Sequence, residues 1–316
     1  MDIRILRYFI AIAEEGSISR AAERLHVAQP ALSAQIRNLE GELGSQLLHR
    51  IPRGVVLTEA GTKLLGHARQ IVRALTLARD DLLGDAAATI GSVTVSFPQS
   101  VAMVLTRPLV EEVLRSLPRV SLSVRESNTG YIPELLRTGR IDAGFVFREA
   151  DTVGLKARRL LDEELLVIGP PGAFENGAGG IAPKPLRFSR LAQLPLVIPG
   201  RPHSLRELLN DYARRARIEL RTLVEVDAIP QIKELVAAGV GHAVLSSNSV
   251  REDLAAGRIA AARIVSPALR RSVFLCGQAE VPQTRAVRAV EETILRVAAG
   301  LVDTGSWDAR LGSAID

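Results

Sequence analysis

Apolar residues near the amino terminus recur at the spacing of a helix in three consecutive segments, residues 1–16, 17–25 and 29–43. In the third segment the apolar positions are separated by 4, 3 and 4 residues, which places them on one helical face. Residues 26–28 leave room only for a tight turn between the second and third segments. We therefore predict two short helices joined by a corner. The apolar face of the second of these helices consists of Leu32, Ile36, Leu39 and Leu43.

This helix pair fits a helix-turn-helix that binds DNA. Ser19 can cap its first helix, and Pro30 suits the first turn of its second helix, where a backbone N–H would be unpaired anyway. In such a motif the amino-terminal end of the second helix enters the major groove. An ordinary helix pair in a small core is the alternative and stays open here. The side chains left for other faces of the second helix are Gln29, Ala31, Ser33, Ala34, Gln35 and Arg37.

Residues 50–57 form two short extended pieces around an Arg-Gly turn, the pattern of a β-wing. We expect Arg50 and Arg53 to project toward phosphates or the minor groove beside the second helix. A basic surface hairpin that makes no contact with DNA is the alternative reading of this segment.

From Thr58, a plausible helix cap, to about Leu83 the chain predicts one long helix with apolar residues every 3.5 positions. Such a helix extends nearly 40 Å, about 1.5 Å per residue, and a small winged domain cannot bury its whole seam. A partner helix from a second subunit would cover it and place two DNA-binding motifs side by side. A helix packed on its own chain is the alternative. The predicted seam is Leu64, Ala68, Ile71, Leu75, Ala78 and Leu82, and residues 84–88 follow as a hinge-like break.

Beyond Gly91, strand-like segments alternate with helical ones, and residues 141–147 are continuously apolar, as in a parallel sheet covered on both faces. We predict two α/β sub-domains joined by crossing strands, with helix amino termini pointing into the cleft between them. Expected strands are 93–97, 120–124, 141–147, 165–169, 196–199, 222–226, 242–246 and 272–277. Expected helices are 101–116, 130–138, one from Ser204, 230–238 and 284–300, and the Gly- and Pro-rich residues 172–185 are expected to form a surface loop.

Composition and charge exclude several classes of protein. The chain has 316 residues and 47% hydrophobic residues, yet no apolar run long enough to span a membrane and no export signal, so we expect a cytoplasmic protein. Its single cysteine, Cys276, rules out an internal disulfide and more often marks a small core residue than a reactive thiol. Its five histidines are scattered, so we expect no metal, no cofactor and no enzyme active site. The net charge of +5 is not concentrated in residues 1–60.

The motifs together resemble the LysR-type transcriptional regulators over nearly the whole chain. The amino-terminal match is LRYFIAIAEEGSISRAAERLHVAQPALSAQIRNLEGELGSQLLHR followed by RGVVLTEAG, and LLRTGRIDAGFVF, LVAAGVGHAVL and AGRIAAARI match recurring phrases of the effector domain. PGRPHSLR and VEVDAIPQIKELVAAGVGHAVL also resemble the nitrogen assimilation control subgroup.

The resemblance implies an amino-terminal all-α winged helix-turn-helix plus a long linker helix, and a carboxy-terminal α/β domain of two sub-domains like a periplasmic binding protein. It implies a homodimer or homotetramer that binds and bends double-stranded promoter DNA. An effector in the cleft then changes the contact with RNA polymerase. The expected boundaries are 1–58 for the DNA-binding domain, 59–88 for linker and hinge, 89–162 and 268–302 for sub-domain I, 163–267 for sub-domain II and 303–316 for a tail.

Carried over by position, the DNA contacts would come from Gln29, Pro30 and Ser33, flanked by Arg50 and Arg53, while the face of the second helix adds Arg37. This sequence departs from the family at Ala34, where a basic or amide side chain is frequent, and at Leu48, where Phe is usual. Ala34 offers only a methyl group to a base.

The effector pocket implied by the family lies at three loops. Arg201 beside His203 at a helix start favours an anion such as a carboxylate, although both could instead be solvated loop residues. A related regulator that needs no small coinducer is the alternative function. A solute-binding protein is less compatible, because it would need an export signal and no DNA-binding motif. The expected pocket residues are Gln99, Ser100, Ser127, Asn128, Thr129, Pro199, Arg201, His203 and Ser204.

Overall fold

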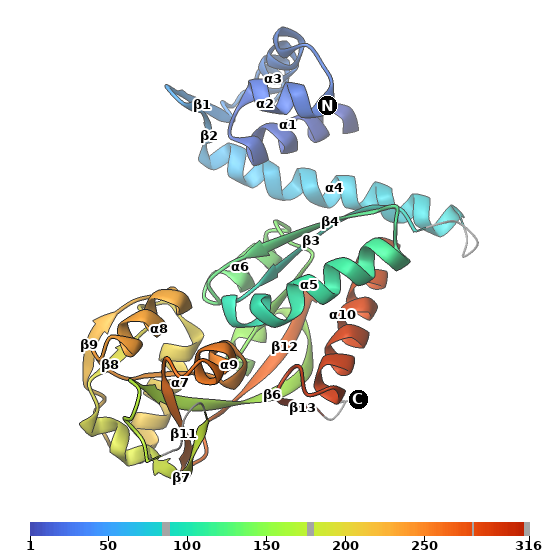
Figure 1. The fold of residues 1–316 in the computed structure, drawn as a ribbon. Helices are drawn as coiled ribbons and strands as arrows, with labels where there is room; N and C mark the ends of the chain where they lie inside the picture. Colours follow the sequence, from blue (N-terminus) through green and yellow to red (C-terminus); the bar gives the residue numbers. More distant parts are fainter. Residues whose placement is uncertain (84–88, 176–179, 280, 313–316) are drawn as a thin grey trace. The chain divides into compact units, whose positions relative to one another are not determined.

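The computed structural model describes residues 1–83, 89–175, 180–279 and 281–312 (Figure 1). The predicted hinge at 84–88, residues 176–179 of the predicted loop and the last four residues of the predicted tail lie outside the described residues. The chain divides into two compact units. The amino-terminal unit is Met1–Ala88 with Pro282–Arg285, and the effector unit is Thr89–Val281 with Ala286–Asp316.

The amino-terminal unit contains the predicted helix pair, wing and long helix. Ser17, and not Ser19, caps the first helix of the pair, because the Ser17 hydroxyl accepts the Arg20 backbone N–H at 3.4 Å. His26 ends that helix in the left-handed conformation, and the Thr58 hydroxyl caps the long helix by accepting the Gly61 N–H at 2.9 Å. The elements are α1 (Ile3–Glu15), α2 (Ile18–Leu25), α3 (Gln29–Leu43), β1 (Leu48–Ile51), β2 (Gly54–Leu57) and α4 (Glu59–Leu83).

The wing is an antiparallel hairpin in which Arg50 pairs with Val55. Its second strand is fixed to the corner between α1 and α2, where the Val55 N–H donates to the Gly16 carbonyl at 3.0 Å. Gly54 is required at this point, since its φ is 135° and a Cβ there would lie 2.1 Å from the Gly16 oxygen. The position of the wing relative to the helix pair is therefore set by backbone contacts.

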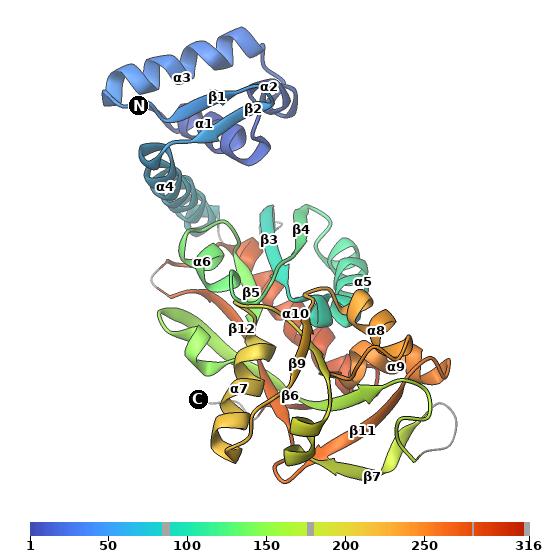
Figure 2. The ribbon, with the colours of Figure 1, turned by 90° about the vertical axis from the view of Figure 1, so that its left-hand side faces the viewer.

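The effector unit has two lobes, each with its own apolar core, and the strands β6 (Leu155–Gly169) and β12 (Arg270–Gln278) join them (Figure 2). The first part of β6 pairs with β12 and its last residues pair with strands of the second lobe. The first lobe contains β3 (Gly91–Phe97), α5 (Gln99–Ser116), β4 (Val120–Glu126), α6 (Ile132–Arg137), β5 (Ala143–Val146), the 3-10 turn η1 (Glu149–Thr152), α10 (Arg285–Asp303) and β13 (Ala309–Leu311). The second lobe contains β7 (Ile181–Arg187), η2 (Phe188–Gln193), β8 (Leu196–Ile198), α7 (Ser204–Ala216), β9 (Thr222–Glu225), α8 (Ile229–Ala237), β10 (Ala243–Ser246), α9 (Ser247–Ala255) and β11 (Ala260–Val265).

The sheet is mixed and not simply parallel. The strand β3 is parallel to β4 and β5, whereas β12 runs antiparallel to both β5 and β6. As predicted, β12 and α10 return to complete the first lobe, where Val273 and Val290 lie in its core.

Two sequence predictions were wrong in this unit. The segment 181–185, expected in a loop, belongs to β7, and its Pro183 and Pro185 are tolerated because β7 is an edge strand. Residues 305–312, expected in a tail, are packed on the first lobe, with the Trp307 side chain fully buried. A lone tryptophan in a polar stretch has no periodicity that could reveal its burial.

Candidate functional site

The exposed surface of α3 carries most of the predicted DNA contacts. Gln29, Pro30 and Arg37 are exposed, but Ser33 is only 6% exposed and accepts the Gln29 side-chain N–H at 3.3 Å. The expectation that Ser33 lies on an outer face of the helix was wrong. It sits three residues before Ile36 and shares the inner face of the helix, where its small side chain fits.

The wing presents Arg50 on β1 and Arg53 at the turn, and both are exposed. Within the described residues, neither of them nor Arg37 forms an ion pair. Each guanidinium is therefore available to a phosphate, which positions a protein on DNA without specifying its sequence.

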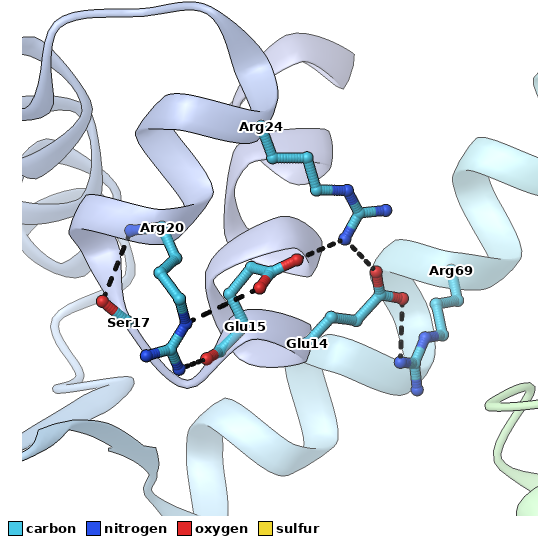
Figure 3. Close-up of polar contacts among 6 residues, drawn as sticks. All are labelled: Glu14, Glu15, Ser17, Arg20, Arg24 and Arg69. Atoms are coloured by element: carbon cyan, nitrogen blue, oxygen red, sulfur yellow. Dashed lines mark hydrogen bonds and ion pairs between the residues drawn. The ribbon is translucent and has the colours of Figure 1, made fainter.

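Other arginines of this unit are used internally, in a network that joins three helices (Figure 3). The carboxylate of Glu14 on α1 accepts Arg24 of α2 at 3.0 Å and Arg69 of α4 at 3.3 Å. Arg24 also donates to Glu15 at 3.2 Å, and the hydrogen bond to Glu14 is the main cause of the raised pKa of Arg24. The network fixes α4 against the helix pair near the middle of its length.

The predicted seam on α4 divides into two parts. Leu64 is half-buried against the core of its own unit, as the self-packing alternative expects for this position, and Ala68 is fully buried. Leu75 is half-buried, whereas Ala78 is exposed and Ile71 and Leu82 are 43% and 87% exposed. The carboxy-terminal part of the seam therefore remains available to a partner helix.

In the effector unit, two adjoining cavities of about 30 and 220 Å³ share Pro98, Gln99, His203 and Asp227. Four helices begin at this pocket: α5 at Gln99, α7 at Ser204, α8 at Ile229 and α9 at Ser247. The amino terminus of a helix carries partial positive charge, which attracts negative groups, although α7 and α8 already donate amino-terminal N–H groups to Thr129, His203 and Gln99.

Most predicted effector residues meet at this pocket. The smaller cavity is lined by Gln99, Ser100, Pro199 and His203, and the larger one adds Ser127, Asn128 and Thr129. Arg201 does not line it, because its exposed side chain points to Glu207 at 3.6 Å. Ser204 is buried beside the pocket and bonds to neighbouring protein groups instead.

Three hydrogen bonds cross between the lobes at the pocket. The Ile229 N–H donates to the Gln99 side-chain oxygen at 2.6 Å. Ser204 donates its backbone N–H to the Thr129 hydroxyl at 3.0 Å and its own hydroxyl to Asp151 at 3.1 Å. These bonds hold the lobes together around the cavities.

The cation of the pocket is Arg271, which sequence analysis missed. Its side chain is almost completely buried, donates to the Ser100 hydroxyl at 2.8 Å, and lies 2.6 Å from Glu163. The guanidinium carbon is 3.8 Å from the centre of the Phe147 ring. Arg270 and Arg271 stand side by side just before the apolar strand predicted at 272–277, and nothing in that pattern indicates that one of them is buried.

His203 is a neutral donor in the pocket. Burial, and then the positive charge of Arg271, lower the pKa of His203 to about 4, although Asp227 acts in the opposite direction. Its Nδ1 accepts the Leu205 N–H at 3.1 Å, so the ring proton resides on Nε2. The charge of Arg271 therefore affects the pKa of His203 more than the charge of Asp227 does.

The described residues give little support to a reactive thiol, a metal site or a membrane span. Cys276 is fully buried, and burial raises the pKa of its thiol to about 12, which suppresses the reactive thiolate. The described residues contain no group of three side chains suited to a metal ion. No helix among them is long and apolar enough to cross a membrane.

Comparisons with known proteins identify the family to which both units are similar. The model of the bacterial regulatory helix-turn-helix protein, lysR family, matches residues 3–62, and the LysR substrate binding domain matches residues 86–299. The nitrogen assimilation regulatory protein Nac of Escherichia coli (strain K12) is 30% identical over 301 residues, covering 94% of this chain and 95% of Nac.

Solved structures of similar fold span both units. Full-length CbnR complexed with its target DNA superposes with a TM-score of 0.61 at 28% identity, covering 94% of this chain and 100% of that one. A full-length OxyR variant of Pseudomonas aeruginosa gives a TM-score of 0.75 at 24% identity, covering 93% and 98%, which is a likeness of fold.

Proposed function

The chain belongs to the LysR family of DNA-binding transcriptional regulators with an effector domain, and on that premise we propose that it senses a small anion, such as a carboxylate, and adjusts transcription at a dyad-symmetric promoter site. The observation that supports the anion most directly is the meeting of four helix amino termini and Arg271 at one pocket.

The proposed site lies where the two cavities adjoin, with the carboxylate directed toward Arg271 and Ser100 of the smaller cavity and the rest of the ligand in the larger one. Glu126 brings negative charge to the larger cavity, and Asp227, which accepts the Gly200 N–H at 2.9 Å, lines both cavities. A carboxylate is therefore favoured next to Arg271 and disfavoured at the outer rim. Arg201, from which the sequence predicted this preference, lies outside the pocket and is not part of the proposed site.

On the DNA side, we propose that Gln29 and Pro30 contact bases or backbone, and that Arg37, Arg50 and Arg53 contact phosphates or the minor groove. The exposed part of the α4 seam supports a dimer that places two such surfaces on one site, with tetramer formation as the next level. Effector binding would then change the geometry of the assembly on DNA and its contact with RNA polymerase.

A regulator that acts without a small coinducer is the second candidate. At the pocket, three hydrogen bonds already join the lobes, and the cavity beside Arg271, about 30 Å³, has room for little more than a water molecule. In this case the pocket is a closed structural element, and DNA binding does not depend on a ligand.

A thermal-shift screen of small carboxylates separates the two candidates. We expect at least one carboxylate to raise the melting temperature of the wild type and of Arg201→Ala, the matched control outside the pocket. We expect Arg271→Lys to lose most of this rise, because a lysine cannot reproduce the guanidinium geometry. If no carboxylate raises the melting temperature of the wild type, the coinducer-independent regulator is favoured. If Arg201→Ala loses the rise in melting temperature while Arg271→Lys keeps it, the assignment of the site to Arg271 is contradicted.

Footprinting on the DNA upstream of the chain's own coding sequence tests the promoter site. The expected result is a protected region with two-fold symmetric half-sites, whose pattern changes when the active carboxylate is added. Protection that shows no half-site symmetry would contradict the proposed dimeric binding.

A further inference from the structure

The carboxy-terminal segment Gly305–Leu311 is attached to the strand that joins the two lobes. Ala309 of β13 pairs with Glu163 of β6, and the Trp307 indole N–H donates to the Glu163 carboxylate at 2.7 Å. Both side chains are completely buried. We call residues 305–311 the carboxy-terminal strap.

The carboxylate of Glu163 also binds the pocket arginine. Arg271 donates its Nε–H to Glu163 at 2.7 Å and directs another N–H to the Ser100 hydroxyl at 2.8 Å. Ser100 and Arg271 both line the pocket. A continuous chain of buried polar groups therefore runs from the pocket wall through Arg271 and Glu163 to Trp307.

The helix α9 makes a second connection between the pocket and the strap. Its Ser249 lines the pocket, while its Asn248 accepts the Asp308 N–H at 2.9 Å. Arg251 of the same helix donates to the Gly305 carbonyl at 2.8 Å. Both walls of the pocket are thus bonded to the strap.

We propose that Glu163 and Trp307 are positioning residues for effector recognition, and that occupancy of the pocket by an anion is transmitted through Arg271 and Glu163 to the carboxy-terminal strap. The proposal rests on the proposed function, in which the pocket holds an anion. Trp307 fixes Glu163, and Glu163 holds the guanidinium and neutralises its charge. An anion that accepts hydrogen bonds from Arg271 competes with Glu163, so the polarity around the indole changes.

Charge and burial explain why this arrangement fits a recognition role. A buried ion pair stabilises a fold little more than apolar residues of the same volume, because both charges must be desolvated. Removing one partner, however, leaves an uncompensated charge. Here that uncompensated charge would be Arg271 in the wall of a pocket, where an anion from solution can replace Glu163.

The only tryptophan of the chain is Trp307, so its fluorescence reports on the strap without labelling. The probe is sodium acetate, which replaces sodium chloride at constant ionic strength in solutions of the full chain. Glu163→Gln keeps the side-chain shape and removes the counter-ion of Arg271. The matched control is Glu164→Gln, since Glu164 lies next in the strand and faces Arg263 at 3.8 Å.

In Glu163→Gln, we expect acetate to change Trp307 emission saturably, with a half-saturating concentration at least about 10-fold lower than in the wild type or Glu164→Gln, as for the gain of a charge-assisted contact. Saturating acetate should raise its melting temperature by roughly 3 °C. The double variant Glu163→Gln/Arg271→Met should show neither effect. An equal acetate response in Glu163→Gln and Glu164→Gln, or an unchanged response in the double variant, would overturn the proposal.

A milder variant tests the same series of buried polar contacts if Glu163→Gln does not fold. Ser100→Ala removes only the pocket-side hydrogen bond of Arg271, so it should shift the emission of Trp307, whereas Ser249→Ala should change it less. Emission identical to the wild type in Ser100→Ala would overturn the coupling. The carboxylate screen of the wild type tests the proposed function separately, because the acetate response of Glu163→Gln depends only on the counter-ion role.

Discussion

Glu14 and Arg69 lie 3.3 Å apart and join the first helix of the chain to the long helix α4. The same carboxylate binds Arg24 of α2 at 3.0 Å (Figure 3). Near the start of α4, Thr58 donates its hydroxyl proton to the Gln46 carbonyl at 2.7 Å. Two separated attachments of this kind fix the direction in which a helix leaves a domain. In a dimer built on α4, that direction sets the distance between two DNA-binding surfaces.

Glu14→Gln should therefore make the protein tolerant of half-site spacing. We expect its preference for the native spacing over one changed by two base pairs to fall by about two- to fivefold, the usual worth of a partly exposed ion pair. Binding to an isolated half-site should stay the same. The measurement is a set of mobility-shift titrations, with Glu59→Gln as the control because, in the described part of the chain, Glu59 pairs only with Lys63 on the same helix. An equal loss of affinity at every spacing would contradict this role.

Gln29 and Arg53 should contribute differently to DNA binding. Gln29→Ala is expected to weaken binding to the true site by roughly 10-fold and to random DNA much less, as when a base contact is lost. Arg53→Ala should weaken binding to the true site and to random DNA alike, and should reduce the slope of log affinity against log salt concentration by about 1. Titrations on both DNAs at several salt concentrations make the comparison. An equal loss on both DNAs for Gln29→Ala would exclude base contact by this residue.

Local sequence patterns predicted several of the helices and strands. The helix pair follows from apolar residues at helical spacing, the wing from two short extended pieces around an Arg-Gly turn, and the return of β12 and α10 from their place at the end of the alternating strands and helices. Ser33 was misplaced because a small hydroxyl side chain fits either face of a helix. The edge strand β7 was missed because its prolines are as typical of a loop as of an edge.

The charged centre of the pocket could not be predicted, for a different reason. Arg271, Glu163 and Trp307 are far apart in the sequence and are brought together by the pairing of β6 with β12 and with β13. A single sequence assigns Arg and Glu to solvent, because such residues are rarely buried unless they are paired. The pocket loops at Gln99, Ser127 and His203 were found through family resemblance.

The exposed end of the α4 seam leads to a prediction on assembly. Ile71→Lys should raise the dissociation constant of the dimer by at least about 10-fold, because a large apolar side chain is replaced by a charge at the interface. It should not unfold the monomer, since Ile71 is already 43% exposed. Analytical ultracentrifugation measures the constant, and Gln70→Lys, exposed on the same helix beside the seam, is the control. If both variants dimerise like the wild type, α4 does not form the interface.

His203 predicts how the stability of the effector unit depends on pH. The folded state resists protonation because burial and Arg271 lower the pKa of His203 from 6.5 to about 4, whereas the unfolded chain binds the proton at its ordinary pKa. The free energy of unfolding should therefore be highest above pH 6.5 and fall as the pH is lowered toward 4. The loss should be on the order of 2 kcal/mol, allowing for the partial exposure of the ring.

His203→Asn separates this effect from general acid destabilisation. Asparagine can replace the Nδ1 acceptor that caps α7, since it is a favoured residue at the start of a helix, but it does not titrate. Urea unfolding followed by Trp307 emission should show a shallower loss of stability between pH 6.5 and pH 4 than in the wild type. His49→Asn, an exposed histidine of the wing, should follow the wild type. The same slope in His203→Asn and the wild type would mean that His203 is protonated in the folded pocket, and that the positive potential of Arg271 does not reach it.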